Sequence, residues 1–226
     1  MADSPEDVKR LIAVGDIHGC LSQLVTLMDR VVPSAQDQFV FVGDYIDRGA
    51  DSRGVVEYLI GFGQEFPGTV FLKGNHEDML LRALGEEEVY LEHFVCNGGL
   101  QTIESYGSLE AIPAGHLDFF RELTLFYETE RFFISHAGVN PAKALHAQDE
   151  HDLLWVREPF LTSGRDFGKT IVHGHTPEPG PLVVEGRRIN VDTGAVYCAT
   201  GPGGKDGLGR LTAMDVLTGE FWQAGD

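Results

Sequence analysis

The sequence is poor in basic residues, and this shortage excludes two classes of partner. Its 226 residues include 17 lysines and arginines against 35 aspartates and glutamates, which gives a formal net charge of −18. Nucleic acids and anionic membrane surfaces select clustered positive charge, so we expect neither as a partner. A small phosphorylated substrate stays compatible with this composition if metal ions supply positive charge locally.

Cysteines and long apolar runs are also scarce. The three cysteines, Cys20, Cys96 and Cys198, are odd in number and show no CxxC spacing, which favours a reduced protein of the cytoplasm. Residues 1–10 are polar and lack the basic and apolar regions of a secretory signal. No apolar run approaches the roughly 20 residues of a membrane span. We therefore expect a cytoplasmic protein with a flexible N-terminus at residues 1–10.

The chain is nevertheless rich enough in apolar residues, at 42%, to bury a core. Strand-like segments at 11–19, 39–44 and 69–77 are each followed by a helical pattern, and this order predicts an α/β fold. A mostly helical stretch follows at 86–126. No linker or repeat interrupts the pattern, so we predict a single domain over residues 11–226.

Strand patterns return in the second half of the chain. Residues 131–138 and 169–177 read as buried strands. Residues 181–196 and 210–222 alternate in hairpin fashion, which suggests an antiparallel sheet. Between them, residues 198–209 are rich in glycine and predict a flexible insertion.

Polar side chains follow five of these apolar strands at the point where each strand ends. In open α/β sheets, ligand sites form at the carboxyl ends of strands. Taken singly, each such residue is more often a turn or a hydrogen-bonded structural residue, but five successive strand ends favour a common site. Oxygen and nitrogen donors without a thiolate suit manganese, iron or zinc. The candidate ligands are Asp16, His18, Asp44, Asn75, His136 and His175.

Two details of this set bear on how it would hold metal. Residues i and i+2 of an extended segment point the same way, so Asp16 and His18 can share one ion. A carboxylate such as Asp44 can bridge two ions. His173 lies two positions before His175 and is an alternative ligand, although we favour His175 because it lies within the GHT motif.

Five motifs resemble the signature of the calcineurin-like metallophosphoesterases: GDIHG at 15–19, GDYIDRG at 43–49, GNHE at 74–77, HAG at 136–138 and GHT at 174–176. More narrowly, they resemble the phosphoprotein phosphatase family of Ser/Thr protein phosphatases in its compact bacterial and phage form. With NGG, SYG, LLWVRE and VDTGAV, the resemblance covers residues 11 to 216. It implies a β-sandwich of two mixed sheets flanked by helices, with the active site at the carboxyl ends of strands.

The resemblance also implies how the ligands divide between two divalent metal ions, for which we expect manganese, with iron or zinc as alternatives. Asp16 and His18 would bind the first ion and Asp44 would bridge both. Asn75, His136 and His175 would complete the ligands of the second ion. No histidine follows GHTP as it does in broader metallophosphoesterases, so the first ion would carry extra waters.

Four further residues receive roles by the same resemblance. His76 is similar to the family's general acid and Asp47 to the carboxylate that orients it. Arg48 and Arg157 resemble the two arginines that grip phosphate oxygens, a task for which planar guanidinium groups are suited. The dipeptide Tyr197-Cys198 is similar to a Tyr-Cys pair near the active site of eukaryotic members.

The implied reaction is hydrolysis of a phosphomonoester by direct attack of a metal-bridging hydroxide. The expected substrates are phosphoserine or phosphothreonine in proteins or peptides, with phosphotyrosine as a further candidate. The alternative is a dinucleoside polyphosphate hydrolase built on the same fold and metals. GDYIDRG and GNHE favour the protein phosphatase, since the alternative usually departs from both. A non-catalytic scaffold is disfavoured, because every ligand and the catalytic histidine are present. The sequence leaves the oligomeric state open.

Overall fold

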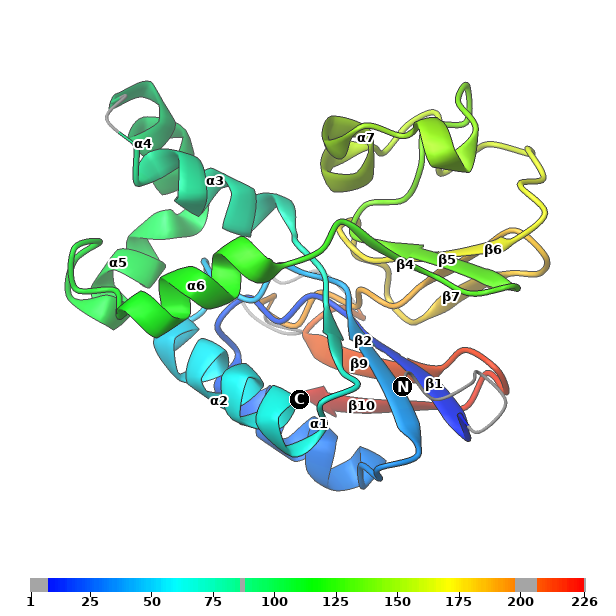
Figure 1. Cartoon of the computed structure of the whole chain (residues 1–226), viewed down its shortest axis with the longest axis horizontal. Coiled ribbons are helices and arrows are strands. Elements are labelled where there is room, and N and C mark those ends of the chain that lie inside the picture. Colours follow the sequence, from blue (N-terminus) through cyan, green and yellow to red (C-terminus); the bar gives the residue numbers. More distant parts are fainter. Residues whose placement is uncertain (1–7, 86–87, 198–206, 226) are drawn as a thin grey trace.

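Two five-stranded mixed sheets pack face to face, with helices on the outer face of each, in the computed structural model of the chain (Figure 1). The structure describes residues 8–85, 88–197 and 207–225. Both the α/β class and the helix-flanked pair of mixed sheets that the sequence predicts are confirmed.

The first sheet has the order β10-β9-β1-β2-β3, in which β1 and β2 are parallel and β9 runs antiparallel to β1. Its strands are β1 (Arg10–Val14), β2 (Asp37–Phe41), β3 (Val70–Phe71), β9 (Arg210–Asp215) and β10 (Phe221–Gly225). Helices α1 (Leu21–Val31) and α2 (Ser52–Glu65) cover its outer face.

The second sheet has the order β4-β5-β6-β8-β7, with β5, β6 and β8 parallel. Its strands are β4 (Phe126–Glu128), β5 (Phe132–Ser135), β6 (Thr170–His173), β7 (Leu182–Val184) and β8 (Arg188–Asn190). The short helices η3 (Leu145–Ala147) and α7 (Glu150–Trp155) lie in the connection between β5 and β6.

A helical group fills the connection between β3 and β4 and lies at one end of the sandwich (Figure 1). It comprises α3 (Asn75–Ala83), α4 (Glu88–Phe94), η2 (Val95–Gly99), α5 (Leu100–Tyr106) and α6 (Ala114–Glu122). The helical stretch predicted at 86–126 corresponds to its last four members. Among the described residues, no helix is both long enough and apolar enough to cross a membrane.

The alternation of side chains along each strand explains the layers. In β1, Ile12 and Val14 pack with the helices, whereas Leu11 and Ala13 pack against the second sheet. The second sheet repeats this pattern, because Phe133 contributes to a third apolar cluster beneath α7. Strands buried on both faces carry continuous apolar runs, and this is why they stand out in the sequence.

Two expectations about strands need correction. The hairpins of residues 181–196 and 210–222 do not share one antiparallel sheet: β7 and β8 extend the second sheet, and β9 and β10 extend the first. The third strand is only two residues long, and GNHE begins helix α3 instead of ending a strand.

Three further expectations, on the N-terminus, the glycine-rich insertion and the number of domains, stay undecided. Strand β1 begins at Arg10, within the segment expected to be flexible, and residues 1–7 lie outside the described residues. Of the predicted glycine-rich insertion, residues 198–206 also lie outside them. The single domain stays a prediction.

Candidate metal centre and active site

Strained backbone marks the end of the sandwich where the predicted ligands meet. Six described non-glycine residues have a positive φ, and five of them are candidate site residues. Such residues cost about 1–3 kcal/mol each and persist only where the surrounding structure enforces them, most often at functional sites. The five are His18, Asp44, Asp47, Arg48 and His175.

One cluster of donors joins the two sheets. Asp44 after β2, His136 after β5 and His175 after β6 place ligand atoms within 4.8 Å of one another. His136 Nε2 lies 3.5 Å from Asp44 Oδ1 and 3.1 Å from His175 Nδ1. Asn75 Oδ1 lies 2.9 Å from the same nitrogen. This cluster contains all the residues predicted for the second ion together with the predicted bridge.

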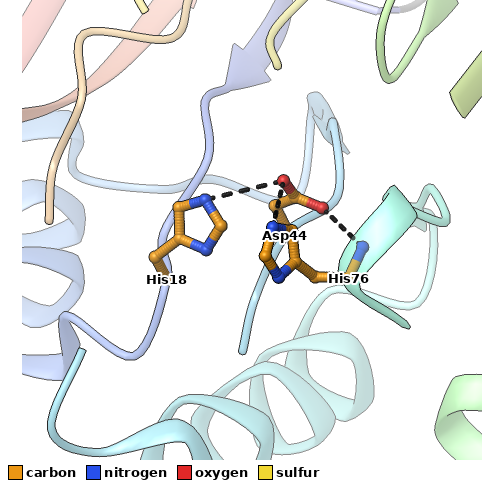
Figure 2. A group of neighbouring side chains, drawn as sticks. All are labelled: His18, Asp44 and His76. Atoms are coloured by element: carbon orange, nitrogen blue, oxygen red, sulfur yellow. Dashed lines mark hydrogen bonds and ion pairs between the residues drawn. The ribbon is translucent and has the colours of Figure 1, made fainter. Parts of the chain in front are cut away.

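A second cluster shares Asp44 and lies beyond the carboxyl ends of β1 and β2. It consists of His18, Asp44 and His76, again with ligand atoms within 4.8 Å (Figure 2). His18 Nε2 is 3.5 Å and His76 Nε2 is 3.9 Å from Asp44 Oδ2. Because Asp44 belongs to both clusters, its two oxygens face different sets of imidazoles. This is the placement that a bridging carboxylate needs.

The ring tautomers make these clusters suitable for metal. The Nδ1 atoms of His18 and His136 lie 2.9 Å and 3.0 Å from the carbonyl oxygens of Ile46 and Val42. A carbonyl can only accept, so both rings carry their proton on Nδ1 and turn the Nε2 lone pair toward Asp44. The lone pair of His136 also meets the Asn75 oxygen. Lone pairs that face one another repel unless a cation lies between them.

Burial keeps the histidines in the form that binds metal. It lowers the pKa of His18 to about 3 and that of His175 to about 2, so both rings are neutral at pH 7. Burial raises the pKa of Asp44, but the neighbouring histidines bring it well below its usual range. The buried Nε2 atoms of His76 and His175 have no hydrogen-bond partner. Two divalent ions fit this donor set.

Asp16, two residues after β1, contacts the backbone of the loop that carries His175. Its carboxylate accepts the backbone N–H of His175 at 3.0 Å, and it belongs to neither cluster. The extended geometry expected from Asp16 to His18 is wrong at His18, whose φ is +47°. Burial and the charges of Asp192 and Asp44 raise the pKa of Asp16 well above its usual range. A cation nearby would offset the repulsion among these three buried carboxylates.

Asp192 is a site residue that the sequence reasoning missed, although its motif VDTGAV was noted. It is buried and accepts the N–H of Gly194 at 2.9 Å. Burial and the charge of Asp44 raise its pKa to about 7. Glycine at position 15 lets the chain after β1 pass close to the backbone of residues 191 and 192, because a Cβ on residue 15 would lie 2.3 Å from the carbonyl oxygen of Val191.

His76 is held by a buried chain of hydrogen bonds. Its Nδ1 lies 2.6 Å from Asp47 Oδ2, and the Thr102 hydroxyl donates to Asp47 Oδ1 at 2.5 Å. The N–H of Asp47 in turn donates to Thr102 and to Ser52. Burial lowers the pKa of His76, but Asp44 and Asp47 raise it more, so the net shift is upward. The ring can therefore hold a proton near neutral pH.

Glu77, the last residue of GNHE, organises the loop that carries Asp44. It is fully buried, and its carboxylate accepts the N–H groups of Asp44 and Gly74 at 2.9 Å each and that of Tyr45 at 2.8 Å. A longer contact of 3.4 Å reaches Ile46. The sequence reasoning gave Glu77 no role, because a motif alone does not show which backbone groups converge on it.

The two arginines lie at the exposed edge of the site. Arg48 Nη1 is 2.8 Å from His18 Nε2, and the Arg48 N–H donates to the carbonyl of Gly98 at 3.0 Å. A Cβ at Gly98 would lie 2.6 Å from the Arg48 side chain, which explains the glycine in NGG. Arg157 lies two residues after helix α7, and its charge adds a little to burial, the main cause, in lowering the pKa of His136 and His175.

His173, the alternative ligand, lies away from both clusters. Its Nδ1 is 3.0 Å from the carbonyl of Gly174, its Nε2 is 3.3 Å from Arg188, and its ring meets Phe160 edge to face. The preference for His175 therefore agrees with the geometry. Tyr197 is described, but Cys198 lies outside the described residues, so the Tyr-Cys pair stays a prediction.

Two stacked mixed sheets with carboxylates, imidazoles and an amide gathered at their strand ends define a hydrolase of the metallophosphoesterase type. Residues 9–201 match the family model described as calcineurin-like phosphoesterase, and the chain belongs to this family. The resemblance to this superfamily is thereby confirmed, whereas the narrower resemblance to protein phosphatases is not.

Two curated relatives share one name, bis(5'-nucleosyl)-tetraphosphatase PrpE (asymmetrical). The protein from Oceanobacillus iheyensis (strain DSM 14371) is 30% identical over 216 residues, covering 81% of this chain and 83% of the relative. The protein from Bacillus thuringiensis (strain Al Hakam) is 28% identical over 235 residues, covering 89% and 88%.

Solved structures show the same fold. One, provisionally assigned as a diadenosine tetraphosphatase, has a TM-score of 0.71 at 23% identity and covers 98% of this chain and 96% of its own. A protein serine/threonine phosphatase from Saccharomyces cerevisiae has a TM-score of 0.64 at 15% identity, covering 98% and 81%. At these identities the structures support the fold alone.

Proposed function

We propose that the protein hydrolyses dinucleoside polyphosphates, cleaving a bis(5'-nucleosyl) tetraphosphate asymmetrically. The observation that carries this proposal is the shared name of curated relatives that match the chain over 81% and 89% of its length. It replaces the protein phosphatase that GDYIDRG and GNHE favoured. Those motifs hold Asp44, Asp47 and His76 around the metal centre, which both reactions use, so they do not discriminate between the substrates.

The chain's own residues suit hydrolysis at phosphorus. When bound, two divalent ions supply an activated water and draw charge from the phosphoryl oxygens. Asp44, with Asn75, His136 and His175, would hold one ion, and Asp44, with His18, the other, to which the family resemblance adds Asp16. Arg48 and Arg157 would neutralise the equatorial oxygens of the transferred phosphoryl group. We expect manganese to support activity, with iron or zinc as alternatives.

One observation favours a second candidate, the serine/threonine phosphatase. The His76–Asp47 pair, with 2.6 Å between Nδ1 and Oδ2, places a proton-holding imidazole beside Asp44. A serine alkoxide leaves only with a proton, so a general acid matters most for phosphomonoesters. A nucleotide leaving from a phosphoanhydride is stable as an anion and depends on that proton less.

A substrate comparison tests the two candidates. Enzyme loaded with manganese is assayed on diadenosine tetraphosphate, on phosphoserine and phosphothreonine peptides and on p-nitrophenyl phosphate. We expect the highest kcat/KM for diadenosine tetraphosphate, with AMP and ATP as products. A higher value for a phosphopeptide would instead establish the protein phosphatase. Asp44→Asn serves as the control, since any activity that it retains comes from a contaminating enzyme.

A further inference from the structure

A cavity of about 350 Å³ lies between α3 and α7, next to the cluster of Asp44, His136 and His175. Asp78 and Arg82 line it from α3, and Glu150, His151, Leu154 and Trp155 line it from α7, with Asp149 directly before that helix. The mechanism at phosphorus uses none of these seven residues. Ligand cavities usually span about 300–1,000 Å³, so this space suits one compact group of a larger substrate.

Trp155 connects the cavity to the metal centre. Its ring centroid lies 6.3 Å from that of His175, and the two planes are nearly perpendicular at 80°. On the α4 side, His93 lies nearly parallel to Trp155, with centroids 6.0 Å apart and planes at 27°. Trp155 is half-buried and His93 is exposed. A partly open aromatic surface therefore begins one ring away from a predicted metal ligand.

A purely structural role explains part of this arrangement, because Trp155 packs against the edge of the helical core. That packing still leaves Trp155 only half-buried, and part of its side chain lines the cavity. Planar, half-open aromatic surfaces of this kind stack well on nucleobases, every one of which offers a π face.

The charges around the cavity favour a neutral occupant. Asp78 pairs with Arg82 at 2.8 Å, and Glu150 pairs with Lys73 at 2.9 Å. Asp149 likewise pairs with Lys143 at 2.6 Å. Because these carboxylates already have cationic partners, the cavity offers little attraction to a basic peptide, and its arginine, Arg82, is already paired with Asp78. Their polar atoms can still bond the edge of an uncharged ring.

We propose that this cavity binds one nucleoside of the substrate, with the base stacked on the part of Trp155 that lines the cavity. The inference rests on the proposed function, for which it supplies the substrate-recognition site. The phosphate chain would then run from the cavity past His175 to the metal centre. Stacking of a base on one aromatic side chain raises its binding affinity roughly ten- to a hundredfold.

Inhibition by small fragments tests the proposal without relying on the natural substrate. Hydrolysis of p-nitrophenyl phosphate is inhibited with AMP, with ribose 5-phosphate and with inorganic phosphate. We expect AMP to inhibit wild-type enzyme about tenfold more strongly than ribose 5-phosphate. Trp155→Ala removes this advantage and leaves inhibition by phosphate unchanged, whereas Trp155→Phe keeps most of it. Equal inhibition by AMP and ribose 5-phosphate in the wild type overturns the proposal.

Fluorescence gives a readout independent of turnover. The chain has two tryptophans, and Trp222 on β10 lies outside the cavity, with the Arg10 guanidinium over its ring. In Trp222→Phe enzyme, AMP should quench the emission of Trp155 and ribose 5-phosphate should not. Trp222→Phe alone should keep the AMP preference. Quenching of the same size by both ligands would contradict stacking.

The nucleoside site and the proposed reaction can fail separately. If diadenosine tetraphosphate is cleaved efficiently but AMP shows no advantage over ribose 5-phosphate, the reaction stands and the Trp155 site is refuted. If AMP binding depends on Trp155 but a phosphopeptide is the better substrate, the site stands as a nucleotide-binding site and the proposed reaction is refuted.

Discussion

At the scale of single residues, the most informative side chain is His76, because it belongs to a cluster of metal-binding geometry and also pairs with Asp47. If it acts as the general acid, His76→Asn should slow phenyl phosphate hydrolysis far more than p-nitrophenyl phosphate hydrolysis, since p-nitrophenolate leaves without a proton. General acid catalysis is worth about 10²–10⁴-fold, which bounds the gap in kcat. Equal losses together with reduced metal content would identify His76 as a ligand instead.

Thr102 offers a milder test of the same pair. It lies 55 positions from Asp47 in the chain, and its hydroxyl both donates to the Asp47 carboxylate and accepts the Asp47 N–H. Thr102→Val should therefore misorient the pair and reproduce the leaving-group bias of His76→Asn at about a tenth of its size. Thr102→Ser keeps the hydroxyl and should restore the wild-type ratio of kcat values. A purely structural threonine would lower both rates alike, with no bias for Ser to rescue.

At the scale of elements, helix α3 aligns the metal centre through Glu77. Glu77→Gln turns an amide N–H₂ toward backbone N–H groups that now meet a carboxylate oxygen, leaving a buried donor unsatisfied. This costs about 1–3 kcal/mol. We expect a lower free energy of unfolding in urea and weaker manganese binding, because the Asp44 loop loses its anchor.

The neighbouring residue of α3 provides the matched control. Asp78 pairs with Arg82, whose side chain is half exposed, and such pairs contribute about 0–1 kcal/mol. Asp78→Asn should therefore leave both unfolding and manganese affinity near wild-type values. Equal effects of the two substitutions would show that α3 responds to any loss of charge, and that Glu77 has no special role.

At the scale of the whole molecule, metal should stabilise the fold. Asp16, Asp44 and Asp192 are buried within one region, so removing bound cations leaves their charges uncompensated. We expect a chelator to abolish activity and lower Tm, and manganese to restore both. An ion present at a hundred times its Kd adds about 2.7 kcal/mol to the free energy of unfolding. Asp44→Asn should lose most of this manganese-dependent rise, and an identical Tm with and without chelator would refute the coupling.

Acid should weaken the fold through His173. Burial lowers its pKa from 6.5 to about 3, so between these values the unfolded chain takes up a proton that the folded protein refuses. The stability that the neutral, buried His173 gives the fold is therefore complete above pH 6.5 and declines as the pH falls toward 3. His173→Gln should be less stable than wild type at pH 7.5, and the difference in Tm should shrink at pH 5. A constant difference would contradict this linkage.

The sequence by itself determined the fold class and most of the candidate site. Buried strands carry apolar runs, and each of these ligands lies within four residues of a strand end, so local pattern was sufficient to find Asp44, Asn75, His136 and His175, although Asn75 begins helix α3. What only the tertiary structure decided lies between segments distant in the chain. The hairpins went to different sheets because β9 pairs with β1, some 200 residues away, and strand alternation does not specify the partner.

The same reason applies inside the site. Thr102 beside Asp47, Asp16 beside His175 and His93 beside Trp155 are contacts between separate elements, and no spacing in the sequence encodes them. The motifs specify a phosphorus-directed metal centre because its ligands are local. The surface that we propose to select the substrate lies between α3 and α7, which are separate in the chain, and for that reason the motifs alone do not encode it.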